Sequence, residues 1–145
     1  MLNLQSSFLK GLLLYAFSFV VLSTIIFATP AFLGTDDYYH ARIADEIIQQ
    51  GRLRLDFPWL PLTILDTNHF VDHHLLYHLY VAPFMHLGGI TGAKLATVSI
   101  AAAVFLAAWL LLRQIKVSNA WLWTMGLFAL SVPFIYRMLV IRTQG

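Results

Sequence analysis

The sequence contains no cysteine and few charged residues. Of its 145 residues, 11% are Asp, Glu, Lys or Arg, whereas 59% are hydrophobic. Without cysteine the chain can form neither a disulfide framework nor a thiolate metal site, although this absence says nothing about the redox compartment. Soluble domains contain about 25% charged residues, so the composition indicates an integral membrane protein that lies in a lipid bilayer.

A run of basic residues is also missing. The nine Lys and Arg residues are scattered, and the formal net charge is only +2 at pH 7. Proteins that follow a phosphate backbone gather their positive charges on one face or in one segment, so the sequence argues against nucleic-acid binding. Because no internal repeat, low-complexity segment or linker interrupts the chain, we predict one membrane domain over residues 1–145.

Four apolar runs are long enough to be considered as membrane spans. A spanning helix needs roughly 20 mostly apolar residues, and we predict such helices over residues 11–28, 72–87, 93–112 and 121–136. The predicted fold is therefore all-α, a multi-pass transmembrane bundle of about four helices. A cleaved signal peptide is disfavoured for the first run, because its apolar core exceeds the usual length of about 7 to 15 residues.

The distribution of basic residues does not decide the orientation of this four-helix arrangement. The side that holds the N-terminus would carry Lys10, Lys94, Arg137 and Arg142, while five other basic residues would lie on the opposite side. The rule that cytoplasmic loops are rich in Lys and Arg needs a clearer difference than this. Composition therefore favours a cytoplasmic N-terminus only slightly.

Residues 29–71 form a polar loop that we expect to lie outside the membrane. Helix-capping residue types precede residues 38–50, and Gly51 follows them, which predicts a helix between these two signals. Apolar side chains recur at intervals of four along this stretch, as in an amphipathic helix. We expect this helix to lie at the membrane interface.

Asp36 and Asp37 are adjacent at the start of that helix. Hard divalent cations such as Mg2+ and Mn2+ prefer oxygen ligands, and one carboxylate could instead serve as a general base. Asp is also among the residues preferred at a helix N-cap. The residues alone favour capping and leave the cation site open.

A second ionisable cluster lies where the loop meets the next apolar run. It comprises Asp72, His73, His74 and His78. On a helix, His74 and His78 would share a face and could bind a metal ion or haem. The spacing fixes no third ligand, and interfacial histidines often hydrogen-bond only to headgroups or loop backbone, so the metal or haem site is the minor alternative.

Two motifs in this order resemble the amino-terminal part of the GT-C superfamily of membrane glycosyltransferases. They are Asp36-Asp37-Tyr38-Tyr39-His40-Ala41-Arg42 after the first span and Phe70-Val71-Asp72-His73-His74 before the second. The chain is most similar to the oligosaccharyltransferase catalytic subunit and its prokaryotic relatives. The resemblance implies a cytoplasmic N-terminus in a prokaryotic cell membrane, an outward-facing first loop, and sugar transfer from a polyprenyl-phosphate carrier to an acceptor.

The resemblance also assigns roles to residues. Asp37, directly before the aromatic pair, matches the acidic residue that helps to bind a divalent cation (Mg2+ or Mn2+) and positions or deprotonates the acceptor, with Asp36 beside it. The residues that follow are the substrate-binding candidates: Tyr38, Tyr39, His40 and Arg42. The metal-binding candidates combine both motifs: Asp36, Asp37, His73 and His74.

The chain is shorter than the enzymes it resembles. Members of the superfamily usually have many more spans, further acidic loop motifs and often a soluble C-terminal domain, so we expect the chain to supply only part of a catalyst. The rival hypothesis is an accessory subunit of a membrane complex, whose His74 and His78 bind haem or metal or whose helices pack against other subunits. A third hypothesis is a fragment without independent function.

Overall fold

The computed structural model describes residues 2–55, 71–130 and 132–141. Within these ranges the chain forms five helices and no strand. They are α1 (Leu2–Ile26), α2 (Asp36–Gln50), α3 (Leu75–Gln114), α4 (Ala120–Leu130) and α5 (Val132–Leu139). The prediction of an all-α fold is confirmed for this part of the chain, whereas the arrangement of the helices differs from a simple four-helix bundle.

Two helices are long and apolar enough to cross a membrane by themselves. They are α1, over Ser6–Ile26, and α3. A third span would require α4 and α5 together, but the two helices are bent by 91° relative to each other. Residues 121–136, predicted as one helix, are divided between α4 and α5. The physical reason is Pro133, which has no N–H to donate to the carbonyl one turn earlier and is accepted only in the first turn of a helix.

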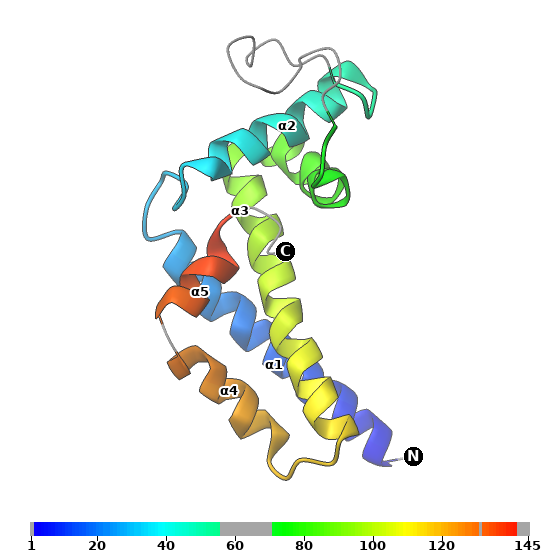
Figure 1. Ribbon diagram of the computed structural model, residues 1–145. Coiled ribbons are helices and arrows are strands. Elements are labelled where there is room, and N and C mark those ends of the chain that lie inside the picture. Colours follow the sequence, from blue (N-terminus) through cyan, green and yellow to red (C-terminus); the bar gives the residue numbers. More distant parts are fainter. Residues whose placement is uncertain (1, 56–70, 131, 142–145) are drawn as a thin grey trace.

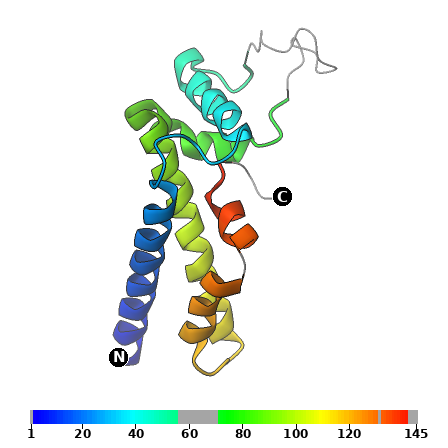
Figure 2. The ribbon, with the colours of Figure 1, turned by 90° about the vertical axis from the view of Figure 1, so that its left-hand side faces the viewer.

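Helix α3 consists of two helical segments, residues 75–88 and 90–114, which meet at a kink at Gly89, where φ is 55° and ψ is −139°. They correspond to the two helices predicted over residues 72–87 and 93–112, but the first segment does not lie parallel to the second as a neighbouring span would. Residues 75–88 lie across one end of the molecule beneath α2, and residues 90–114 run beside α1 (Figures 1 and 2). At 1.5 Å per residue the first segment measures about 21 Å, which is less than the roughly 30 Å of a hydrocarbon core.

The bend in α3 depends on a close approach of its two segments. A Cβ atom on Gly92 would lie 1.8 Å from the carbonyl oxygen of Phe84, so only glycine fits there. The Tyr80 hydroxyl donates a hydrogen bond of 3.2 Å to the carbonyl of Ala96 across the same corner. These contacts hold residues 75–88 as a fixed layer on the end of the α1 and α3 pair.

Helix α2 packs on this layer through its apolar side. Ala41 and Ala44 contact Val81 and Ala82 of α3 in one buried cluster. As predicted, Gly51 follows the helix in a left-handed conformation, with φ of 63°, and its N–H bonds to the carbonyl of Ile47. The apolar side predicted for the membrane interface is therefore used largely within the protein, and the position of α2 relative to lipid remains a prediction.

Lys94 fixes the junction between α1 and α3. Its buried ammonium group donates to the carbonyl oxygens of Ile26 at 3.1 Å and Thr29 at 2.6 Å. Carbonyls at a helix C-terminus lack partners within the helix, and a cation there also interacts favourably with the helix dipole. This contact places Lys94 at the opposite end of α1 from Lys10, so their predicted grouping on one side of the membrane is wrong.

Candidate functional site

The site predicted from the sequence lies at the start of α2, just beyond the end of α1. Thr35 occupies the N-cap position without a capping hydrogen bond from its side chain. The carboxylate of Asp37 instead reaches back, and its Oδ2 accepts a 2.9 Å bond from the backbone N–H of Gly34. The start of α2 is thus stabilised by the side chain of Asp37 in its first turn and not by that of the N-cap residue.

Asp37 also binds a distant part of the chain. Its Oδ1 accepts a 2.9 Å hydrogen bond from the backbone N–H of Ile141, 104 residues away, and the residue is only 1% exposed. Buried carboxylates are stable when hydrogen bonds replace the lost water. Asp37 therefore clamps the start of α2 to the segment that follows α5, and both of its oxygens take part.

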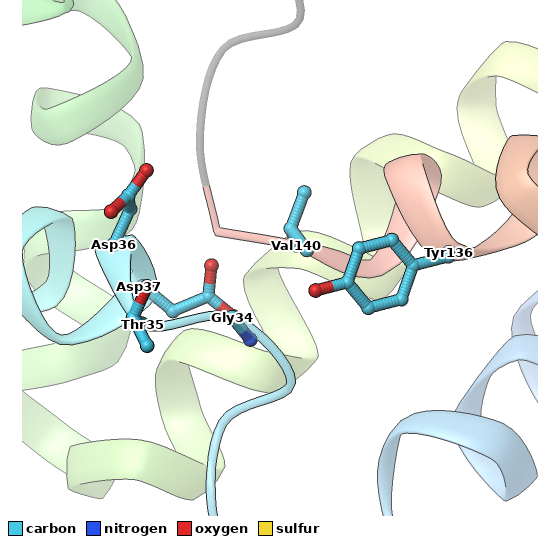
Figure 3. A pocket seen from close by; sticks show the side chains of 6 residues that line it. All are labelled: Gly34, Thr35, Asp36, Asp37, Tyr136 and Val140. Carbon is cyan, nitrogen blue, oxygen red and sulfur yellow. The ribbon is translucent and has the colours of Figure 1, made fainter.

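Asp36 has a different environment from its neighbour. Its residue is exposed, and Figure 3 shows its carboxylate directed away from that of Asp37. Both belong to a pocket of about 90 Å³, whose other lining residues are Gly34, Thr35, Tyr136 and Val140. Ligand pockets usually measure about 300–1,000 Å³, so this pocket has room for a reactive group but not for a whole sugar donor.

The described residues do not show the predicted cation site. No group of three or more His, Asp or Glu side chains in the described ranges is arranged to hold a metal ion. In this conformation the carboxylates of Asp36 and Asp37 diverge, and both oxygens of Asp37 accept backbone hydrogen bonds. His73 is exposed, and His74 belongs to the histidine cluster described next.

The structure brings residues of the two predicted motifs together in a way that their spacing did not predict. His40 of α2 and His78 of α3 are joined by a 2.8 Å hydrogen bond between Nδ1 and Nε2. His78 is joined in turn to Asp72 by a 2.6 Å bond between its Nδ1 and Oδ2. The three side chains form a hydrogen-bonded chain, and both histidines are buried.

The geometry of the hydrogen-bonded side chains of Asp72, His78 and His40 determines which ring nitrogens carry protons. Burial acts to raise the pKa of Asp72, but hydrogen bonds from the His78 side chain and the His74 backbone N–H outweigh it and hold the pKa below its usual value. An ionised Asp72 accepts a hydrogen bond from His78 Nδ1–H, which leaves His78 Nε2 as the acceptor for His40 Nδ1–H. Of the four ring nitrogens of His40 and His78, only His40 Nε2 then lies outside these bonds, so a further proton on this pair binds there.

His40 resists that further proton at neutral pH. Burial, together with the nearby His78 and His74, lowers the pKa of His40 to about 4. The His74 ring lies beside it, with 5.3 Å between the ring centroids. His40 therefore presents a neutral imidazole that can accept a hydrogen bond, and the negative charge of the cluster is on Asp72.

The remaining predicted substrate-binding residues occupy other surroundings. Tyr39 is partly exposed and lies beside His40, with ring centroids 5.3 Å apart, and Tyr38 is half-exposed. Arg42 forms ion pairs with Glu46 at 2.6 Å and Asp45 at 3.5 Å on the outer face of the same helix. Tyr39 and His40 thus belong to one site with the histidine cluster, whereas Arg42 mainly pairs within α2.

The histidine pair predicted as a haem or metal site has a different arrangement. His74 is the N-cap of α3, and its backbone N–H donates to Asp72 at 2.9 Å. His78 uses Nδ1 for Asp72 and Nε2 for His40, so neither ring nitrogen is available to a metal in this conformation.

Comparison with known proteins gives no match. No family model, curated protein or solved structure matches this chain. The resemblance stated above therefore rests on the two sequence motifs, and function is argued from the geometry of the site.

Proposed function

We propose that the chain is the amino-terminal module of a GT-C-type membrane glycosyltransferase, which moves a sugar from a polyprenyl-phosphate-linked donor to an acceptor at the extracytoplasmic surface of a prokaryotic cell membrane. One observation carries the proposal: His40, His78 and Asp72 are joined by hydrogen bonds within the layer that α2 and residues 75–88 form at one end of the apolar helices (Figures 1 and 2). A lipid-linked donor presents its phosphate at that depth and leaves its tail in the hydrocarbon.

The two carboxylates have separate roles in this proposal. Asp37 is a positioning residue, because both of its oxygens accept backbone hydrogen bonds. Asp36 is exposed at the pocket and accepts the proton of the acceptor while the acceptor attacks the anomeric carbon and the polyprenyl phosphate departs. Tyr39 and His40, one turn further along α2, contact the substrate.

The chain supplies only part of this active site. The pocket of about 90 Å³ accommodates the reacting group alone, so further helices or subunits must bind the remainder of the donor. A requirement for Mg2+ or Mn2+ stays a prediction from the resemblance. The roles assigned to Asp36 and Asp37 do not use a shared cation, because their carboxylates diverge.

The test is a comparison of Asp36→Asn with Asp45→Asn in the complete membrane enzyme. Asp45 lies on the same helix, pairs with Arg42 and is outside the pocket, which makes it a control for the loss of one carboxylate. Transfer of a radiolabelled sugar from a polyprenyl-phosphate donor is measured in both. We expect Asp36→Asn to reduce the turnover number by about 10²- to 10⁴-fold, the usual contribution of a general base, and Asp45→Asn to leave it unchanged. Undiminished transfer by Asp36→Asn refutes the assigned role.

An accessory subunit of a membrane complex is the second candidate. The observation in its favour is the gathering of three histidines, since the rings of His74 and His78 are 6.1 Å apart and both approach His40. An absorption spectrum and metal analysis of the purified protein distinguish the candidates. A Soret band or a stoichiometric transition metal supports the accessory subunit. Ligation of the haem or metal by His78 requires His78 to break its hydrogen bonds with Asp72 and His40.

A further inference from the structure

A groove lies between α1 and α3, far from the site on α2. It has a volume of about 400 Å³ and is lined mainly by apolar side chains, among them Phe8, Leu12 and Leu110. These three side chains are 74%, 52% and 49% exposed. Because α1 and α3 are long and apolar enough to cross a membrane, lipid chains are the expected neighbours of the exposed side chains of this groove.

Trp109 gives the groove its floor. The residue is buried, and a Cβ atom on Gly11 would lie 3.0 Å from its ring. The absence of a side chain at Gly11 thus allows the indole to lie against the backbone of α1. A larger residue at this position would push the ring into the groove.

One end of the groove carries a fixed positive charge. The guanidinium group of Arg113 donates a 2.9 Å hydrogen bond to Ser7 Oγ and lies over the Trp109 ring, 4.7 Å from its centroid. Arginine has five N–H donors in a planar fork that matches phosphate geometry, and only one of them is used by Ser7. The groove is therefore apolar along its length and cationic at its end.

The rest of that end of the molecule reinforces this charge. All seven acidic residues of the sequence lie between positions 36 and 72, and none lies in the segments that contain Ser7 and Arg113. Lys10 and Lys116, in contrast, flank Ser7 and Arg113 closely in the sequence. A phosphate that approaches Arg113 thus meets no carboxylate from the neighbouring sequence.

We propose that this groove binds an anionic phospholipid, with one acyl chain along the apolar wall and the phosphate on Arg113. The apolar lining selects a hydrocarbon chain, and the charge complementarity selects a lipid with a net negative headgroup. Basic pockets between membrane helices are known to favour such headgroups. This inference does not depend on glycosyl transfer.

The test uses Trp109 as a reporter in reconstituted vesicles. The other three tryptophans are replaced by phenylalanine: Trp59, Trp121 and Trp123. Fluorescence is then quenched by brominated phosphatidylglycerol or by phosphatidylcholine with the same brominated chains, at equal mole fractions. We expect at least twofold stronger quenching by phosphatidylglycerol. Equal quenching by the two lipids refutes the preference for an anionic headgroup, and no quenching by either lipid refutes the binding of an acyl chain beside Trp109.

Two matched variants separate the groove from general surface charge. Arg113→Gln should abolish the preference for phosphatidylglycerol, whereas Lys116→Gln, which removes the same charge nearby but outside the groove, should retain it. Equal loss in both variants overturns the proposal in favour of non-specific attraction. Native mass spectrometry of the phosphatidylglycerol that co-purifies with each variant gives a second measurement independent of tryptophan. Circular dichroism confirms that Arg113→Gln is folded.

Discussion

The clamp formed by Asp37 can be tested with the substitution Asp37→Asn, which preserves the size of the side chain and removes its charge. In the parent protein both carboxylate oxygens accept backbone N–H groups, from Gly34 and Ile141, at 2.9 Å each. An amide has only one oxygen. Its NH2 group must therefore face one of the two N–H donors, and that donor loses its partner in a buried site.

The cost of this change follows from the two bonds. A hydrogen bond to a charged group contributes about 1.5–3 kcal/mol, and a buried polar group without a partner costs about 1–3 kcal/mol. We expect Asp37→Asn to lower the free energy of unfolding by about 3–5 kcal/mol. Since whole domains are stable by about 5–15 kcal/mol, such a loss should be readily visible.

Denaturant unfolding in detergent, followed by circular dichroism, measures this loss. Asp36→Asn is the matched control, because the exposed neighbour should change stability by less than about 0.5 kcal/mol. Hydrogen exchange at the amides of Gly34 and Ile141 should become faster in Asp37→Asn alone. If the free energy of unfolding of Asp37→Asn is within 1 kcal/mol of that of the parent protein, the two hydrogen bonds of Asp37 do not stabilise the fold as their geometry indicates.

Two further predictions concern the layer of α2 and residues 75–88. The free energy of unfolding should fall by at most about 1.4 kcal/mol per pH unit as pH decreases from 6.5 toward 4, because His40 binds a proton near its usual pKa when unfolded but only at a pKa of about 4 when folded. Thermal unfolding of the parent protein and of His40→Gln across this range should show the larger slope in the parent. Gly92→Ala should lower the unfolding midpoint and cost about 1–3 kcal/mol, because its Cβ would meet the Phe84 carbonyl, whereas Gly88→Ala has open space and should not; equal midpoints would contradict the tight corner.

Local sequence signals predicted the parts of the fold that depend on neighbouring residues. The long apolar run before Thr29 predicts α1, and Gly51 correctly marks the end of α2. Hydrophobic periodicity and glycine conformational freedom act over a few residues. Such features can be read directly from the chain.

The number of membrane spans could not be predicted from local sequence signals. Residues 75–88 are as apolar as a span, and what turns them across the molecule is the φ of 55° at Gly89 together with the close contact at Gly92. The predicted end of the first helix at residue 87 lies beside Gly89, but the glycines alone do not determine the direction in which the chain turns there. Lys94 offered one signal, since a cation within an apolar run usually has a buried partner, and here it binds the end of α1.

The candidate site was predicted only in its residue types. Asp37, His40 and Asp72 were identified as candidates, but their partners come from tertiary structure. His40 and His78 are 38 residues apart, and Asp37 pairs with the backbone of Ile141, which has no side-chain signature. The hydrogen bonds that link Asp72, His78 and His40 form only because residues 75–88 lie beneath α2, and this placement requires the bend at Gly89.

In the first turns of α2, each exposed candidate residue is followed by a buried residue that anchors the helix through a hydrogen bond to another element. Asp37 and His40 are three residues apart and lie on one side of the helix, where their hydrogen bonds to Ile141 and His78 fix its rotation. Asp36 and Tyr39 precede these anchors by one residue each and are exposed. A rotation of α2 by one residue, about 100°, would break both anchors and bury different side chains. The position of Asp36 at the rim of the pocket is therefore a consequence of the polar bonds made by its neighbour. Loss of Asp37 should disturb the site by misplacing Asp36, whereas loss of Asp36 should remove the reacting group itself.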